Sequence, residues 1–168
     1  MSLLEISNLT VVYPTRTGKF TAVQDVNLSV QPGEILGIVG ESGAGKSTIS
    51  AAIMQLIDYP GYIEKGSIKL SNINLIGMSE DEIYRLRGQK IGVIFQDFQL
   101  LDDRNVNDNL AFVLKATGWK DKQHIEDRIQ NVLQKVGMLD YTHKMPHELS
   151  GGEQQKISIA RALSLIHI

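Results

Sequence analysis

The chain contains no cysteine among its 168 residues. Disulfides, thiolate metal ligands and thiol catalysis are therefore excluded, and a reducing compartment is compatible with the sequence. No apolar run approaches the roughly 18 residues of a membrane span, and the first residues lack the basic start and apolar stretch of a signal peptide. We expect a cytoplasmic protein, peripheral on the cytoplasmic face of the plasma membrane, that reaches the membrane only through a partner.

Neither sign of charge is in excess. Seventeen basic and nineteen acidic residues give a net charge of -2 at pH 7. Because a polyanion requires a broad basic surface, we expect no nucleic-acid partner. The hydrophobic fraction of 42% is ordinary, and a chain of this size buries about 70% of its unfolded surface, which is enough for one domain with a core.

The first half of the chain has the periodicity of β-strands. Apolar and polar residues alternate over residues 4–12 and 22–30, as in half-buried strands, and a turn follows at Pro32-Gly33. The near-continuous apolar runs 35–39 and 91–95 predict strands of a parallel sheet that are covered on both faces.

From residue 67 onward the sequence predicts one strand pair and several helices. Residues 67–76 predict a short strand pair, and Ser79 with Glu82 predicts a capping box that opens a helix. Apolar residues recur at helical spacing around residues 110–114 and over residues 125–136, and a last helix begins near residue 151. The order of elements predicts an α/β core followed by a helical lobe.

A glycine-rich stretch lies between the apolar run 35–39 and a helical pattern at residues 49–56. Residues 40–47 read GESGAGKS and fit the phosphate-loop pattern G-x-x-x-x-G-K-[ST]. In such a loop glycines let successive N–H groups point inward, and the helix amino end adds partial positive charge. We expect this loop to bind ATP with Mg²⁺ through Gly40, Ser42, Gly43, Ala44, Gly45, Lys46, Ser47 and Thr48.

Three of these side chains have separate expected roles. Lys46 would reach the β and γ phosphates, Ser47 would ligate Mg²⁺, and Thr48 would contact the α phosphate. The alternative interpretation is a glycine-rich turn with an incidental lysine.

A second motif stands at residues 149–153, which read LSGGE. Ser150, Gly151 and Gly152 at the start of a helix would form a further anion site from N–H groups and one hydroxyl. An ordinary helix cap is the alternative. One nucleotide has no obvious need for two such sites in one chain.

With both motifs in this order, the chain resembles the ABC ATPase family, whose signature is L-S-G-G-[QE], from about residue 3 to residue 163. The resemblance implies a P-loop NTPase fold with an antiparallel β subdomain and a helical subdomain. We expect a nucleotide-binding domain over residues 1–162: core and β subdomain at 1–95, helical subdomain at 96–150, and signature helix at 151–162.

The resemblance also implies partners. Two ATPase subunits would form a head-to-tail dimer, in which Ser150, Gly151 and Gly152 of one subunit cover the γ phosphate held by the other. An integral membrane subunit would contact the helical subdomain.

Two further residues match family positions. Gln96 matches the Q-loop glutamine, which in relatives contacts Mg²⁺ and the attacking water, so Gln96 and Lys46 are the catalytic candidates and Ser47 and Gln96 the metal candidates. Tyr13 lies where relatives place an aromatic ring that stacks on adenine, and simple packing of a strand-end tyrosine is the alternative.

The family's Asp-Glu pair and switch histidine, which support Mg²⁺ and polarise water, do not follow the signature helix in this sequence. We therefore expect a C-terminally truncated fragment that binds nucleotide without hydrolysing it, whereas the intact parent would hydrolyse ATP. Residues 163–168 resemble a translated sequencing adapter, which predicts a non-native tail, with native sequence as the alternative.

Two kinds of membrane complex are compatible with the residues. Residues 1–88 resemble the ATPases of dipeptide and oligopeptide importers, whereas residues 91–162 resemble the cell-division ATPase FtsE. A chimera of two fragments and a natural divergent member both remain open. A P-loop kinase or GTPase is a third interpretation, which residues 149–153 argue against.

Overall fold

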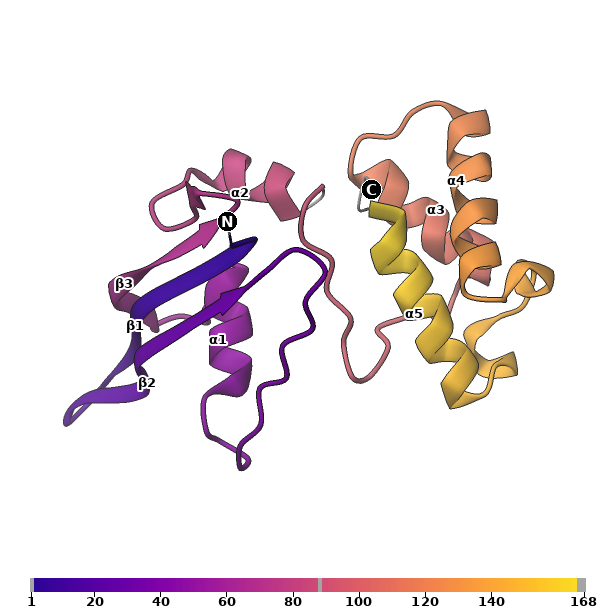
Figure 1. The fold of residues 1–168 in the computed structure, drawn as a ribbon. Helices are drawn as coiled ribbons and strands as arrows, with labels where there is room; N and C mark the ends of the chain where they lie inside the picture. Colours follow the sequence, from indigo (N-terminus) through magenta and orange to yellow (C-terminus); the bar gives the residue numbers. More distant parts are fainter. Residues whose placement is uncertain (1, 88, 166–168) are drawn as a thin grey trace. The chain divides into compact units, whose positions relative to one another are not determined.

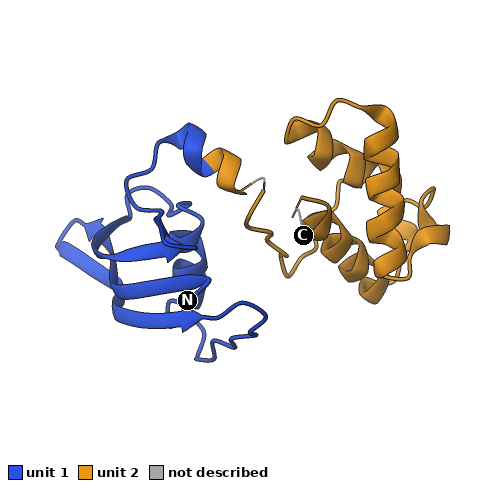
Figure 2. Cartoon of the chain, turned by 45° about the horizontal axis from the view of Figure 1, so that its top comes forward, with its two compact units in different colours: residues 1–83 blue, residues 84–168 orange. Residues whose placement is uncertain are grey.

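The computed structural model describes residues 2–87 and 89–165 (Figure 1). The chain divides into two compact units, residues 1–83 and 84–168 (Figure 2), here called the sheet unit and the helical unit. The boundary at 95/96 that the sequence suggests stays a prediction.

The sheet unit contains a four-stranded antiparallel sheet in the order β2-β1-β3-β4. Its strands are β1 (Leu4–Thr15), β2 (Gly18–Val30), β3 (Tyr62–Leu70) and β4 (Ile73–Asn74). The predictions of two alternating strands and of a strand pair near residues 67–76 are confirmed. The buried side chains of this sheet include Ile6, Leu9, Val11, Val12 and Ile68.

Two helices belong to the first part of the chain. Helix α1 (Lys46–Ile53) buries Ile49 and Ala52. Helix α2 (Glu80–Arg87) begins with the predicted capping box, because a Glu82 carboxylate oxygen accepts from the N–H of Ser79 at 2.9 Å and from its hydroxyl at 2.7 Å.

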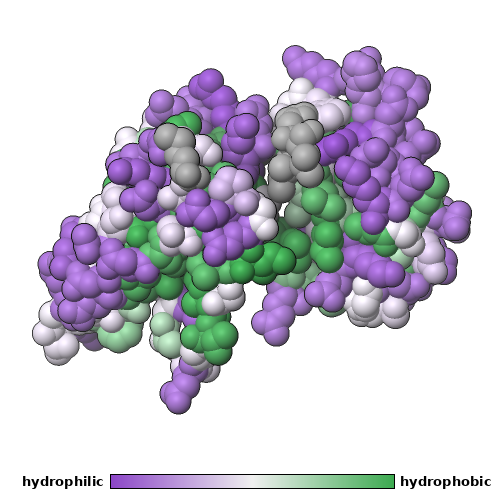
Figure 3. Space-filling view, in the orientation of Figure 1, coloured by the Kyte–Doolittle hydropathy of each residue, from purple (hydrophilic) through white to green (hydrophobic). Residues whose placement is uncertain are grey.

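The two apolar runs predicted as buried parallel strands are not strands in the structure. Residues 35–39 and 91–95 pair with no strand among the described residues, and Ile35 and Val39 are 97% and 96% exposed. Ile94 and Phe95 are also about half exposed. A run of apolar residues becomes a strand only when neighbouring strands take up its backbone N–H and C=O groups. The strand prediction was therefore wrong for both runs. Figure 3 shows that apolar side chains reach the surface of the sheet unit.

After α2, the described residues of the helical unit form three longer helices and two short 3₁₀ turns. The helices are α3 (Val106–Ala116), α4 (Lys122–Lys135) and α5 (Gly151–Leu165), and the turns are η1 (Leu139–Tyr141) and η2 (Pro146–Glu148). The three helical patterns of the sequence are thus confirmed. Their facing apolar side chains form one core that includes Leu110, Leu114, Ile129, Leu133 and Ile157. No helix among residues 2–87 and 89–165 is long and apolar enough to cross a membrane.

One buried polar side chain organises the segment that leads into α3. The Asn109 Oδ1 accepts from the N–H of Leu101 at 2.8 Å, and its Nδ2 donates to the carbonyls of Leu101, Arg104 and Asn105 at 3.0–3.1 Å. Asn109 is 1% exposed, so removing its amide leaves the N–H of Leu101 and the carbonyl of Arg104 without these partners beside a buried position.

We therefore predict that Asn109→Ala lowers the free energy of unfolding of the helical unit by about 2–4 kcal/mol, because each buried unsatisfied polar group costs about 1–3 kcal/mol. Asn107→Ala, two residues away on α3, is the matched control. In the described structure the Asn107 Oδ1 is buried with no hydrogen-bond partner, so its removal should change stability by less than about 0.5 kcal/mol. Urea denaturation, followed by the fluorescence of Trp119, which packs on this core, measures the free energy of unfolding of both variants. Equal losses of stability in the two variants would contradict the role given to the Asn109 amide.

Candidate nucleotide-binding site

The predicted phosphate loop is a turn that ends at the first residue of α1. The N–H of Ala44 donates to the carbonyl of Glu41 at 3.2 Å, and both Gly43 and Gly45 have φ near +83°. An L-residue in this left-handed conformation costs roughly 1–2 kcal/mol, whereas glycine adopts it freely. The glycines of the motif are therefore required by backbone conformation at these two positions.

Gly45 also lies directly against the sheet. A Cβ on Gly45 would stand 2.6 Å from the carbonyl oxygen of Ala22 and 3.0 Å from Cγ2 of Val23, both in β2. Only glycine allows this approach, and it fixes where α1 starts relative to the sheet.

The amino end of α1 has no side-chain cap. Its N-cap residue is Gly45, and no acidic residue lies in its first turn. The first N–H groups of a helix have no partner inside the helix, so those of Lys46, Ser47 and Thr48 are donors for another group. The side chain of Ser47 is exposed, and the helix dipole makes this end electropositive.

Lys46 extends back over the loop. Its Nζ donates to the carbonyls of Gly40 at 2.7 Å and Glu41 at 2.5 Å. An ammonium group has three donors, so one donor and the full positive charge remain for a ligand. The loop, the uncapped helix end and this ammonium group together fit a chain of phosphates.

The residues also fit Mg²⁺ that arrives with a nucleotide. Among residues 2–87 and 89–165 no group of three or more His, Asp or Glu side chains could hold a metal ion. Mg²⁺ is usually bound by few protein ligands together with substrate phosphates and water, and the exposed Ser47 hydroxyl lies beside the phosphate loop.

Tyr13 packs at the end of β1. A Cβ on Gly61 would stand 2.5 Å from the Tyr13 Cε1 and 2.8 Å from Ile57 Cγ2, so the edge of the ring lies against this turn. The packing interpretation of Tyr13 thus has direct support, and adenine stacking stays a prediction.

The signature residues open α5 with a capping box. A Glu153 carboxylate oxygen accepts from the Ser150 hydroxyl at 2.7 Å and from the Ser150 N–H at 2.8 Å, and the N–H of Glu153 donates to the hydroxyl at 3.4 Å. These two hydrogen bonds from Ser150 hold the pKa of Glu153 below its usual value. The capping alternative is therefore realised, while Gly151 and Gly152 are exposed at the helix start.

Gln96 lies in the helical unit, at the corner of a turn. The N–H of Phe98 donates to the carbonyl of Phe95 at 3.3 Å, with Gln96 and Asp97 between them. The Gln96 side chain is exposed.

The profile of the ABC transporter family matches residues 23–166. The chain belongs to this family. The methionine import ATP-binding protein MetN of Desulfitobacterium hafniense is 43% identical over 162 residues, which is 96% of this chain and 46% of that protein. The cell division ATP-binding protein FtsE of Streptococcus pneumoniae is 39% identical over 163 residues, 97% of this chain and 67% of that protein. The chain thus spans about half of the MetN relatives and two thirds of FtsE.

ABC cassettes are also its structural neighbours. The dimeric cassette MJ0796 superposes with a TM-score of 0.80 at 30% identity, covering 96% of this chain and 69% of that chain. A second structure of MJ0796, titled as a post-hydrolysis state bound to ADP and Pi, superposes equally well. The P-loop ABC ATPase fold expected from the sequence is confirmed.

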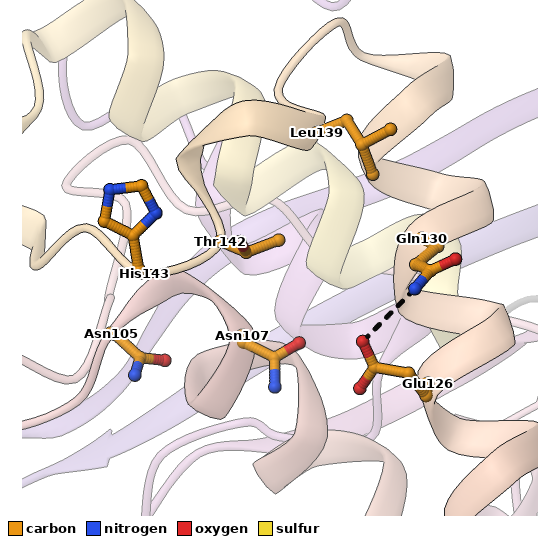
Figure 4. Close-up of a pocket in the computed structure, with 7 residues that line it drawn as sticks. All are labelled: Asn105, Asn107, Glu126, Gln130, Leu139, Thr142 and His143. Atoms are coloured by element: carbon orange, nitrogen blue, oxygen red, sulfur yellow. Dashed lines mark hydrogen bonds between the residues drawn. The ribbon is translucent and has the colours of Figure 1, made fainter.

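The structure adds one pocket that the sequence did not suggest. It is an open, mostly polar hollow of about 520 Å³ between α3, α4 and η1 (Figure 4), lined by Asn105, Asn107, Glu126, Gln130, Leu139, Thr142 and His143. Gln130 Nε2 and Glu126 Oε1 lie 3.5 Å apart. The residues come from α3, α4, η1 and the positions that flank α3 and η1, so no local pattern in the sequence could have grouped them.

We predict that the two left-handed glycines differ in how they tolerate a side chain. Gly43→Ala should lower the free energy of unfolding of the sheet unit by about 1–2 kcal/mol through backbone strain alone, because its Cβ would meet nothing within 4 Å. Gly45→Ala should cost about 3 kcal/mol, since the strain is joined by a backbone clash. Hydrogen exchange of the backbone amides in β1 and β2 measures the free energy of unfolding of both variants. Similar losses of stability in Gly43→Ala and Gly45→Ala would contradict the close approach of Gly45 to β2.

We also predict a pH-dependent cap on α5. Because the pKa of Glu153 is lowered in the folded chain, the stabilisation is complete above its ordinary pKa and is lost as the pH falls through the lowered value. Ser150→Ala should raise the pKa of Glu153 toward its ordinary range, and Ser150→Thr should leave it lowered. Carboxyl NMR titration of Glu153 checks this; an unchanged pKa in Ser150→Ala would refute the cap.

Proposed function

We propose that this chain is the ATP-binding part of an ABC-type membrane complex and that it binds Mg-ATP on residues 40–48. The observation that carries the proposal is the uncapped amino end of α1 at Gly45, with the Lys46 ammonium group lying over the loop. Backbone donors, a helix dipole and a fixed cation on one loop suit a polyphosphate and little else.

Each residue of the loop has a defined task in this proposal. The N–H groups of Gly43 and Gly45 and those at the start of α1 donate to phosphate oxygens, and Lys46 neutralises the β and γ phosphates. Ser47 offers its hydroxyl to Mg²⁺, and Thr48 its hydroxyl to the α phosphate. Bound Mg-ATP supplies the phosphoryl group whose hydrolysis the intact parent would use.

The remaining candidates act around the nucleotide. Tyr13 would stack on adenine with a ring face, while its ring edge packs on Gly61. Gln96 would contact Mg²⁺ and the attacking water, which suits an exposed side chain at a turn corner.

Ser150, Gly151 and Gly152 would cover the γ phosphate bound to a second subunit in a head-to-tail dimer. A dimeric cassette among the structural neighbours supports this arrangement. Glu153 already binds both donors of Ser150, so Ser150 would have to exchange this carboxylate for phosphate oxygens on dimer closure.

The helical unit would contact an integral membrane subunit on the cytoplasmic face of the plasma membrane. The parent would serve transport, as the name of the MetN relatives states, or cell division, as that of FtsE states. The MetN and FtsE relatives each match along nearly the whole chain, and not along one half, so both roles remain candidates. Peptide import is the more specific transport candidate from residues 1–88.

We predict that Lys46→Ala weakens Mg-ATP binding at least about ten-fold, because a hydrogen bond to a charged group contributes about 1.5–3 kcal/mol. Isothermal calorimetry of the folded chain measures the affinity. Lys69→Ala, which removes an exposed lysine from β3, is the matched control and should bind as the unaltered chain does. Equal affinities of Lys46→Ala and Lys69→Ala would overturn the phosphate-loop assignment.

A further inference from the structure

The segment that presents Gln96 is held in a conformation that it would not adopt alone. Phe98 and Gln99, which follow the turn, have φ of 59° and 51°. Left-handed backbone at two successive residues other than glycine is rare and persists only where surrounding structure enforces it.

The groups that enforce it come from α5, sixty or more residues away in the sequence. Arg161 donates from Nη2 to the carbonyl of Phe98 at 2.8 Å and from Nη1 to the carbonyl of Gln99. The Ser158 hydroxyl donates to the same Phe98 carbonyl at 3.3 Å. Ser158 and Arg161 are three residues apart and therefore lie on the same face of α5.

This contact is made by a guanidinium group in a partly buried place. The planar fork of arginine donates to the two neighbouring carbonyls from two nitrogens in a fixed geometry, whereas a lysine ammonium group is a point charge on a flexible stem. Ser158 is fully buried, and burial lowers the pKa of Arg161 from its usual value, while an arginine stays charged at any physiological pH.

The turn itself is continuous with these contacts. Phe98 accepts from Arg161 and Ser158 through its carbonyl, and its N–H closes the turn with Phe95 that has Gln96 at its corner. A few residues further on, the Asn109 amide fixes Leu101. The stretch after Gln96 is thus attached to the helical unit at both of its ends.

We propose that Arg161 is a positioning residue for Gln96, acting through Phe98 and Gln99. Because α5 is one helix from Gly151 to Leu165, Arg161 couples the turn of Gln96 to the signature residues at the helix start. A displacement of α5 when Gly151 and Gly152 meet a phosphate would then move the Gln96 turn with it. This consequence rests on the proposed function, whereas the contact itself does not.

A second arginine offers a matched comparison. Arg128 of α4 donates from Nε to the carbonyl of Ser164 at 3.1 Å and from Nη2 to that of Leu163 at 2.7 Å. It makes the same kind of bond to two consecutive carbonyls, at the far end of α5. Substitution of Arg128 should therefore lower the stability of the helical unit to a similar extent, while the hydrogen bonds to the turn at Phe98 are kept.

The test uses a nitroxide spin label at position 96. Since the chain has no cysteine, Gln96→Cys supplies a single attachment site in the full chain, and no nucleotide is added. Electron paramagnetic resonance should show an ordered label. Adding Arg161→Gln should shorten its rotational correlation time several-fold, Ser158→Ala should do so to a smaller extent, and Arg161→Lys should recover only part of the order.

Arg128→Gln should leave the label at position 96 as ordered as before, although it lowers the melting temperature. An unchanged spectrum in Arg161→Gln, or an equal loosening in Arg128→Gln, would overturn the proposal. If Arg161→Gln does not fold, the same measurement on Ser158→Ala tests the proposal, and an unchanged mobility of the label in that variant would also overturn it.

The experiment contains no nucleotide. A negative result therefore does not affect the phosphate-loop assignment, and a failure of Mg-ATP binding does not affect the contact of Arg161 with Phe98 and Gln99.

Discussion

A side chain at Gly45 would clash with the backbone of β2, and the start of α1, where we propose the phosphate site, depends on that close approach. With only a hydrogen at this position, the left-handed loop residue lies against the carbonyl of Ala22, where a Cβ would be 2.6 Å away. Helix α1 then starts immediately above the sheet and buries Ile49 and Ala52. The first N–H groups of α1 and the Lys46 ammonium group over the loop are the donors that the proposed function assigns to phosphates.

Helices α1 and α5 both begin at glycines of the family motifs, and they differ in what binds their first N–H groups. The start of α1 has no side-chain cap and has a lysine over the loop, which leaves it electropositive and open. The start of α5 is closed by Ser150 and the carboxylate of Glu153, which neutralises the helix end. The first is therefore suited to bind an anion within one chain, whereas the second has to rearrange before it can do so.

Local patterns were sufficient for much of the fold. Alternation of apolar and polar residues found β1 and β2, and the Ser79-x-x-Glu82 sequence found the start of α2, because these signals depend on residues close in the chain. The runs 35–39 and 91–95 were misread since a strand requires partners, and composition cannot show whether partners are present. The contacts of Arg161 with Phe98 and Gln99 span 63 and 62 residues, so they could only be seen in three dimensions.

The motif at residues 40–47 could be recognised from the sequence because a phosphate loop is a short local structure with fixed glycine positions.

Amide NMR of the labelled chain during titration with Mg-ATP most directly tests the claim that residues 40–48 bind the nucleotide, because it locates the nucleotide residue by residue. The account predicts saturable shifts at the N–H groups of Gly43, Gly45, Lys46 and Ser47. Saturable shifts confined to another place, such as the pocket beside Asn107, or no shifts at all from a folded sample, would contradict it.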